Sequence, residues 1–170
     1  DSLTEEEHRR AFAGMLKAAG YEVTGSDENV YPPMSHMLEA WGIKALTPYS
    51  PSNLDVAKPD LVIIGNVIRR VNPEATAVRE RHPRVPIVWG GYFPTLYPEA
   101  AVNAPYVDAA VRGAGEETLP EVLVRSDDGG DSPDFSGVAG VTWKRDGEIV
   151  HEADRPWREP DAFPPLPIER

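Results

Sequence analysis

Short apolar segments followed by glycine constrain the fold of this chain more than any other feature. Three such segments, DLVII, VPIVW and VDAAV, occupy residues 60–64, 85–89 and 107–111, and a glycine follows each within two residues. Continuous apolar runs of this length are typical of strands buried on both faces of a parallel sheet. Helical patterns separate them, and alternating strands and helices predict right-handed βαβ units.

The helical patterns have recognisable ends. A first predicted helix stops at Gly20, a second spans 35–42, and a third spans 72–82. Asn72 and Pro73 have the residue types of a helix cap and a first helical residue. The remaining predicted elements are a strand at 21–24, short helices after Pro98 and at 118–124, and a hairpin over 138–152.

The C-terminal part of the sequence differs from the βα pattern. Asp146-Gly147 separates two strand-like segments, which predicts a tight hairpin turn. Five prolines within residues 156–167 predict an extended linker. We therefore predict one α/β domain over residues 1–170. It has a Rossmann-like or flavodoxin-like parallel sheet with helices on both faces, a C-terminal β-hairpin and a proline-rich tail at 156–170.

Composition excludes several classes of partner and cofactor. The net charge of −11, from 28 acidic and 17 basic residues, disfavours binding to nucleic acid or to an anionic membrane. The chain has no cysteine, so it offers no thiolate ligand for a metal or an iron–sulfur cluster, and its four histidines lack ligand spacing. Without a signal-peptide pattern or a long apolar run, we expect a cytoplasmic location and leave the oligomeric state open.

The first half of the chain resembles the N-terminal domain of UDP-N-acetylmuramate:tripeptide ligases, the murein-peptide ligase family. Residues 13–75 carry this resemblance through the runs AGMLKAAGYEVTGSDENVYPPMS, PDLVIIGN and NPE. The resemblance implies a UDP-sugar site lined by Asp27, Tyr31 and Asn66, with Ser26 beside them. The family's glycine-rich phosphate loop is replaced by TEEEHRRAF. The alternative is that Asp27 is only a cap or turn residue.

The second half resembles the cobalamin-binding domains that precede radical-SAM enzymes. Residues 85–168 carry the runs PIVWGGYFPTLYPE, VDAAVRGAGEETLPEVL and GVTWKRDGEIV, followed by the proline-rich tail. No Asp-x-His-x-x-Gly motif is present, so no histidine ligand of cobalt can be assigned. The alternative is that the glycines only form strand-to-helix turns. The resemblance implies that cobalamin is bound by Gly90, Gly91, Gly113 and Gly115, with Tyr92, Thr95, Glu116 and Thr118 nearby and Asn66 on the remaining wall.

The two resemblances meet between about residues 72 and 85, inside a predicted helix. We interpret the chain as an engineered hybrid whose halves are residues 1–75 and 76–155. Because it has neither a phosphate loop nor a cysteine, we predict that it is not an enzyme. Weak cobalamin binding is the function that we expect it to retain, and a bulky residue at Gly91 should block that binding without harming the fold. The alternatives are a UDP-sugar binding module and a scaffold without a ligand.

Overall fold

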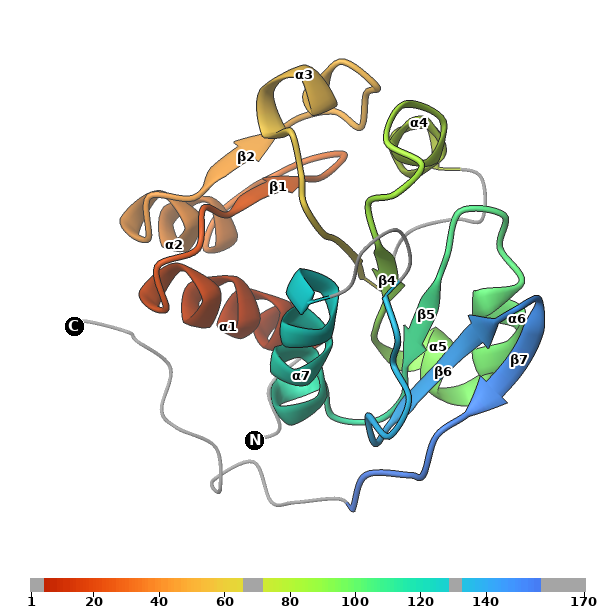
Figure 1. Cartoon of the computed structure of the whole chain (residues 1–170). Coiled ribbons are helices and arrows are strands. Elements are labelled where there is room, and N and C mark those ends of the chain that lie inside the picture. The colour runs from red at the N-terminus through yellow and green to blue at the C-terminus, as the bar shows by residue number, and fades with distance from the viewer. Residues whose placement is uncertain (1–4, 66–71, 129–132, 157–170) are drawn as a thin grey trace. The chain divides into compact units, whose positions relative to one another are not determined.

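The computed structural model describes residues 5–65, 72–128 and 133–156 (Figure 1). The described residues up to Ala57 form one compact unit, and those from Lys58 onward form a second. The organisation of residues 1–170 as a single domain stays a prediction. Asn66 lies outside the described residues, as does the proline-rich tail from residue 157 onward.

The first unit contains a two-stranded parallel sheet. In it β1 pairs with β2, and Thr24 lies opposite Lys44. Gly14 lies against the indole of Trp41, since a Cβ at that glycine would sit 3.3 Å from the ring. The contact between the first two helices therefore requires a small residue. The elements of this unit are α1 (Glu5–Ala18), β1 (Thr24–Ser26), α2 (Met34–Ala40), β2 (Lys44–Leu46) and α3 (Asn53–Ala57).

The second unit contains a five-stranded sheet in the order β3-β4-β5-β6-β7. The pairs β3–β4 and β4–β5 are parallel, whereas β5–β6 and β6–β7 are antiparallel. The predicted parallel sheet and C-terminal hairpin are therefore confirmed. The elements are β3 (Val62–Ile64), α4 (Pro73–Arg81), β4 (Ile87–Trp89), α5 (Tyr92–Leu96), α6 (Pro98–Val102), β5 (Ala109–Val111), α7 (Gly115–Asp128), β6 (Val141–Arg145) and β7 (Glu148–His151).

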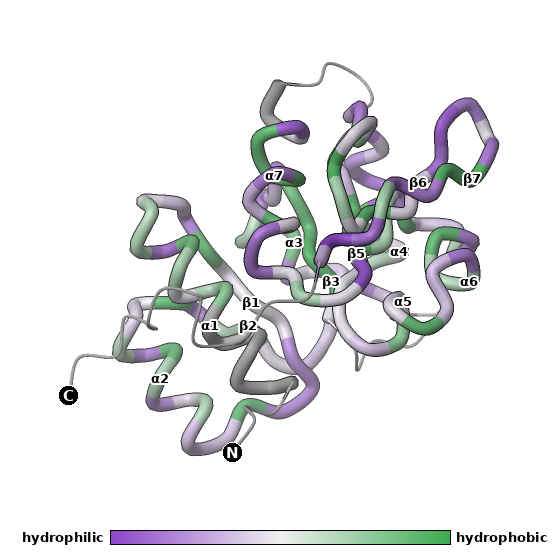
Figure 2. The backbone as a smooth tube through the Cα atoms, turned by 90° about the horizontal axis from the view of Figure 1, so that it is seen from below, coloured by the Kyte–Doolittle hydropathy of each residue, from purple (hydrophilic) through white to green (hydrophobic). Residues whose placement is uncertain are grey.

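Helices cover both faces of this sheet, as predicted. Both views place α7 on one face and α5 with α6 on the other (Figures 1 and 2). Ile87, Val88 and Val111 are almost fully buried between these layers, and Val122 of α7 is buried with them. Figure 2 shows the turn between β6 and β7 in hydrophilic colours, which fits its place outside the core.

The start of α4 follows the sequence signal closely. The Asn72 side chain accepts hydrogen bonds from the backbone N–H groups of Glu74 and Ala75, at 2.9 and 3.0 Å between Oδ1 and each nitrogen. Pro73 is the first helical residue, where its missing N–H costs nothing. This cap fixes where the helix between β3 and β4 begins and confirms the predicted βαβ unit.

Candidate functional site

Two glycine-containing loops leave the sheet side by side. β4 and β5 are neighbouring parallel strands, with Trp89 opposite Ala110. Gly90 and Gly91 follow β4, and Gly113 follows β5, so the two loops start at the same edge of the sheet. The carboxyl edge is where open parallel sheets of this kind bind ligands. The structure thus brings together glycines that the sequence pattern selects, from two strands whose paired residues lie 21 positions apart in the sequence.

One side chain joins the two loops. The Thr95 hydroxyl, on α5, donates to the carbonyl oxygen of Gly91 at 2.8 Å. The Thr95 hydroxyl oxygen also accepts a hydrogen bond from the backbone N–H of Gly113 at 2.9 Å. The Gly113 bond crosses 18 positions of sequence, so it ties the loop after β5 to the helix that follows β4.

The glycines of this edge are required for different reasons. Gly91 has φ 110° and ψ −163°, a region essentially confined to glycine. Gly113 has φ 71°, and a Cβ there would meet no heavy atom within 4 Å. Its bare backbone therefore borders open space. A Cβ at Gly115 would instead lie 3.0 Å from Cδ1 of Leu119, so this glycine serves the packing of α7.

The backbone at Gly91 corrects one sequence-based expectation. A bulky residue there was expected to block the site and leave the fold intact. Its positive φ strains any other residue, and strain of this kind costs of order 1–3 kcal/mol. A substitution at Gly91 therefore changes stability as well as any binding.

Apolar side chains stand exposed beside Gly91. Tyr92 is 63% exposed, Leu96 50% and Tyr97 59%. The first two belong to α5 and lie four positions apart, on one side of the helix. Within the same segment, the buried ring of Trp89 stacks on the half-buried ring of Phe93, with 5.2 Å between ring centroids. The loop after β4 and the helix that follows it therefore offer an apolar surface next to aromatic packing.

Among the described residues, three buried side-chain polar atoms close to these loops have no hydrogen-bond partner. They are Nε1 of Trp89, the last residue of β4, Nε of Arg112, directly before Gly113, and Oε2 of Glu116, in the first turn of α7. Leaving a buried polar group unpaired costs about 1–3 kcal/mol. Such groups are rare in folded proteins, and each calls for an explanation such as an ion, a water or a ligand.

Thr118 lies apart from the loop surface. It is fully buried, and its Oγ1 accepts from Nε of Arg155 at 2.9 Å and lies 3.3 Å from the carbonyl oxygen of Ala139, to which it can donate. Arg155 also forms ion pairs with Glu117 and Glu121 of α7. The structure therefore commits Thr118 to holding the segment after β7 against α7.

Arg112 is a residue that sequence reasoning missed. Its side chain pairs with Asp154 and donates to the carbonyl oxygen of Glu152, and its backbone N–H donates to Gly140 at 2.7 Å. It anchors the residue before Gly113 to the hairpin end. No local signal reveals this role, because the partners lie 28 to 42 positions away in the sequence.

The residues predicted for a UDP-sugar lie in the first unit. Ser26 ends β1, and its hydroxyl lies 3.4 Å from the Nδ2 atom of Asn53. Oδ1 of Asp27 accepts from the N–H of Asn29 at 3.1 Å, which is a local turn. Tyr31 is 61% exposed. This geometry fits the turn alternative for Asp27.

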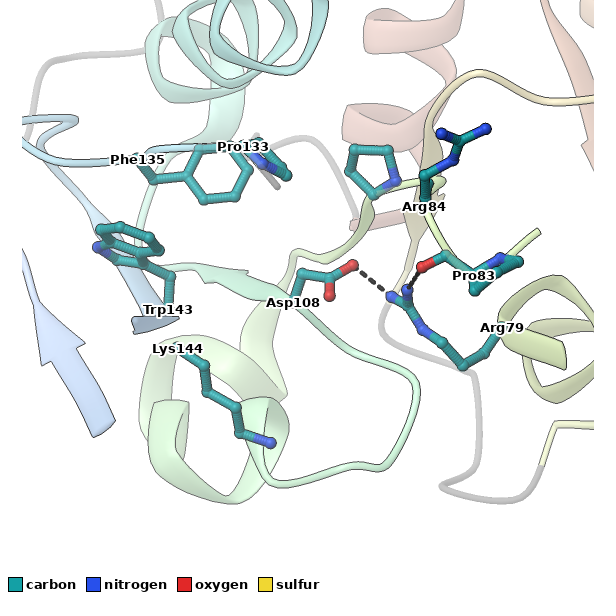
Figure 3. Close-up of a pocket in the computed structure, with 9 residues that line it drawn as sticks. Arg79, Pro83, Arg84, Asp108, Pro133, Phe135, Trp143 and Lys144 are labelled. Carbon is teal, nitrogen blue, oxygen red and sulfur yellow. Dashed lines mark hydrogen bonds and ion pairs between the residues drawn. The ribbon is translucent and has the colours of Figure 1, made fainter. Parts of the chain in front are cut away.

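A pocket of about 120 Å³ lies at the opposite, amino edge of the second unit (Figure 3). Two of its charged groups bind each other: Arg79 pairs with Asp108 and donates to the carbonyl oxygen of Pro83, while Asp108 accepts from the N–H of Ile87 at 2.8 Å. This pairing supports the fold and leaves the glycine loops as the better candidate. The lining residues are Arg79, Pro83, Arg84, Pro86, Asp108, Pro133, Phe135, Trp143 and Lys144.

Beside this pocket, the pKa of Asp134 lies below its ordinary value because Ser136 donates hydrogen bonds to the carboxylate; Arg145 and Arg125 add smaller effects. Among the described residues, no group of three His, Asp or Glu side chains could hold a metal ion. None of the helices within residues 5–65, 72–128 and 133–156 has both the length and the apolar character needed to cross a membrane.

Residues 9–123 match the family model described as "B12 binding domain". The chain is 28% identical, over 160 residues, to an anaerobic magnesium-protoporphyrin IX monomethyl ester cyclase of Rubrivivax gelatinosus; the match covers 91% of this chain and 27% of the cyclase. It is also 51% identical over 71 residues to UDP-N-acetylmuramate–L-alanyl-gamma-D-glutamyl-meso-2,6-diaminoheptandioate ligase of Escherichia coli (strain K12), which covers 42% of this chain and 15% of the ligase.

Among solved structures, the radical S-adenosylmethionine methyltransferase TsrM from Kitasatospora setae, with cobalamin and a [4Fe-4S] cluster bound, has a similar fold. The TM-score is 0.51 at 19% identity, covering 85% of this chain and 30% of TsrM. Both resemblances seen in the sequence are thus confirmed. The B12 match begins at residue 9, so similarity to cobalamin-binding domains extends into the ligase-like half as well.

These relatives contradict the prediction that the chain is not an enzyme. The cyclase is an enzyme, and its match covers 91% of this chain, although this chain spans only 27% of the cyclase. The absence of a phosphate loop and of cysteines from these 170 residues is therefore no evidence against a relationship to enzymes. The idea that the two halves were joined deliberately stays a hypothesis.

Proposed function

We propose that this chain, which belongs to the B12 binding domain family, holds cobalamin at the carboxyl edge of its five-stranded sheet. The observation that carries the proposal is the pair of glycine loops after β4 and β5, which Thr95 joins at that edge. Family membership supports the choice of ligand, and the loops supply the place. In this proposal the chain is the cobalamin-holding part of a larger enzyme, with a cytoplasmic location.

The residues at this edge fit such a ligand. Bare backbone at Gly113 borders open space that a bulky group can fill. The corrin of cobalamin carries amide groups, which can accept from Nε1 of Trp89 and donate to Oε2 of Glu116, two of the three buried atoms without partners. The exposed ring of Tyr92 offers apolar contact. When bound, cobalamin supplies the radical or group-transfer chemistry of its cobalt.

A titration tests the proposal directly. The chain at high micromolar concentration is mixed with hydroxocobalamin, and binding is followed by the visible absorption spectrum and by co-elution in gel filtration. We expect saturable binding with one cobalamin per chain. Glu116→Gln replaces one carboxylate oxygen with an amide donor and should weaken binding about tenfold, the effect of losing roughly one hydrogen bond. Absence of any complex would refute the proposal.

The strand-end loops also predict how the cobalt is ligated. Residues 65–72, 90–99 and 112–118 contain no histidine. We therefore expect no histidine nitrogen bound to cobalt. The electron paramagnetic resonance spectrum of the Co(II) complex should be the same whether the histidines of the chain carry ¹⁴N or ¹⁵N. A change in the nitrogen splitting on labelling would contradict this.

The ligase-like first unit favours a second candidate, a UDP-sugar site at the carboxyl end of β1. Ser26 and Asp27 lie there, although the Ser26 hydroxyl accepts from Asn53 of α3 and Asp27 accepts from the N–H of Asn29 within its own turn. Calorimetric titration with UDP-N-acetylmuramate separates the two candidates, because this ligand changes no visible absorption. Heat from this ligand together with no binding of hydroxocobalamin would favour the second candidate.

A further inference from the structure

We infer that Thr95 is a positioning residue of the cobalamin site, and that it acts by locking the loop after β4 to the loop after β5. This inference rests on the proposed function. The hydroxyl of Thr95 lies between two backbone groups, the carbonyl of Gly91 and the N–H of Gly113. Each of these glycines belongs to a different strand-end loop.

The bond to Gly91 alone would not indicate a positioning role, because it is a common local bond in helices. Threonine in a helix often donates to the carbonyl oxygen four residues earlier, and Thr76 does so toward Asn72 at 3.0 Å. Only the second bond sets Thr95 apart from Thr76. It comes from Gly113, 18 positions away, and so joins segments that the sequence does not hold together.

The bonding capacity of the hydroxyl supports a positioning role. A threonine hydroxyl has one proton to donate, and here the carbonyl of Gly91 takes it. One of its lone pairs accepts from Gly113. Thr95 therefore has no proton left for a ligand while both bonds persist, and its effect on binding passes through the loops.

The loop after β5 is held from both sides of its glycine. Before Gly113, the backbone N–H of Arg112 donates to Gly140 at 2.7 Å, and the Arg112 side chain binds the segment after β7. At Gly113 itself, Thr95 takes the N–H. Losing the Thr95 bond frees the position whose bare backbone borders the open space of the site. Binding must then order this loop, which lowers affinity.

Two substitutions at one position test the inference. Thr95→Val keeps the shape and removes the hydroxyl, whereas Thr95→Ser keeps the hydroxyl. We expect the dissociation constant for hydroxocobalamin to rise about tenfold in the valine variant and by less than about twofold in the serine variant. Thr76→Val is the matched control, because it removes a hydroxyl with a local bond only, and it should leave affinity unchanged.

A second measurement needs no ligand. In the chain without cobalamin, the amide proton of Gly113 should exchange with solvent faster in Thr95→Val than in the unmodified chain or in Thr95→Ser, as followed by NMR. Unchanged exchange at Gly113 would overturn the inference, as would equal losses of affinity in the valine and serine variants. If the unmodified chain binds no cobalamin, the proposed function fails, and the exchange rates still decide whether Thr95 locks the loops.

Discussion

Replacing Gly140 with alanine is expected to lower the free energy of unfolding by about 2–4 kcal/mol. The backbone at this glycine has φ 83°, which strains any residue with a Cβ. An added Cβ would also lie 3.0 Å from Oγ1 of Thr118 and 3.3 Å from the carbonyl oxygen of Arg112. The carbonyl belongs to backbone that Arg112 itself fixes by donating to Gly140, so it cannot move away cheaply.

Gly137 provides the matched control for this substitution. Its φ is 78°, close to that of Gly140, but a Cβ there would meet nothing within 4 Å. Gly137→Ala should therefore cost only the backbone strain, about 1–2 kcal/mol. Urea unfolding followed by tryptophan fluorescence measures both. Equal losses in the two variants would show that the contact with Thr118 and Arg112 does not matter.

The parts of the fold that could be predicted are those encoded locally. Continuous apolar runs gave β3, β4 and β5 because strands buried on both faces need no polar alternation. The helix over Pro73–Arg81 could be predicted because its cap and first residue are adjacent in sequence. By contrast, β2 (Lys44–Leu46) begins with a lysine and lacks a continuous apolar run, and its pairing with β1 depends on contacts that no local pattern records. The strand predicted at 21–24 was misplaced: the strand forms at Thr24–Ser26, and it pairs with β2 in a separate two-stranded sheet.

The candidate site likewise has residues that could be predicted from local sequence and residues that could not. Positions of Gly91 and Gly113 follow from the ends of the apolar strands, so sequence could propose them. The roles of Thr95 and Arg112 depend on bonds across 18 to 42 positions, which appear only when strands pair. Thr118 illustrates the reverse case, in which closeness in sequence misleads. It lies near the loop after β5 in the sequence and was therefore predicted near the ligand, yet its hydroxyl accepts a hydrogen bond from Arg155.

Replacing Asp108 with alanine is expected to lower the free energy of unfolding by about 2–3 kcal/mol. Oδ2 of Asp108 accepts from Arg79 and from the backbone N–H of Ile87. Ile87 is fully buried, so its N–H would lose its partner where water is excluded. The ion pair itself contributes less, because the Arg79 and Asp108 side chains are 26% and 35% exposed.

Two further variants separate the lost amide partner from the lost charge. Asp108→Asn keeps an oxygen that can accept from Ile87 and removes the charge, so it should cost roughly half as much as alanine if the amide bond dominates. Asp154→Ala removes an ion pair with Arg112 in which the aspartate side chain is 86% exposed, and it should cost less than about 1 kcal/mol. Urea unfolding of all three variants decides between the causes. If Asp108→Asn is as damaging as Asp108→Ala, charge rather than the Ile87 amide holds the amino ends of β4 and β5 together.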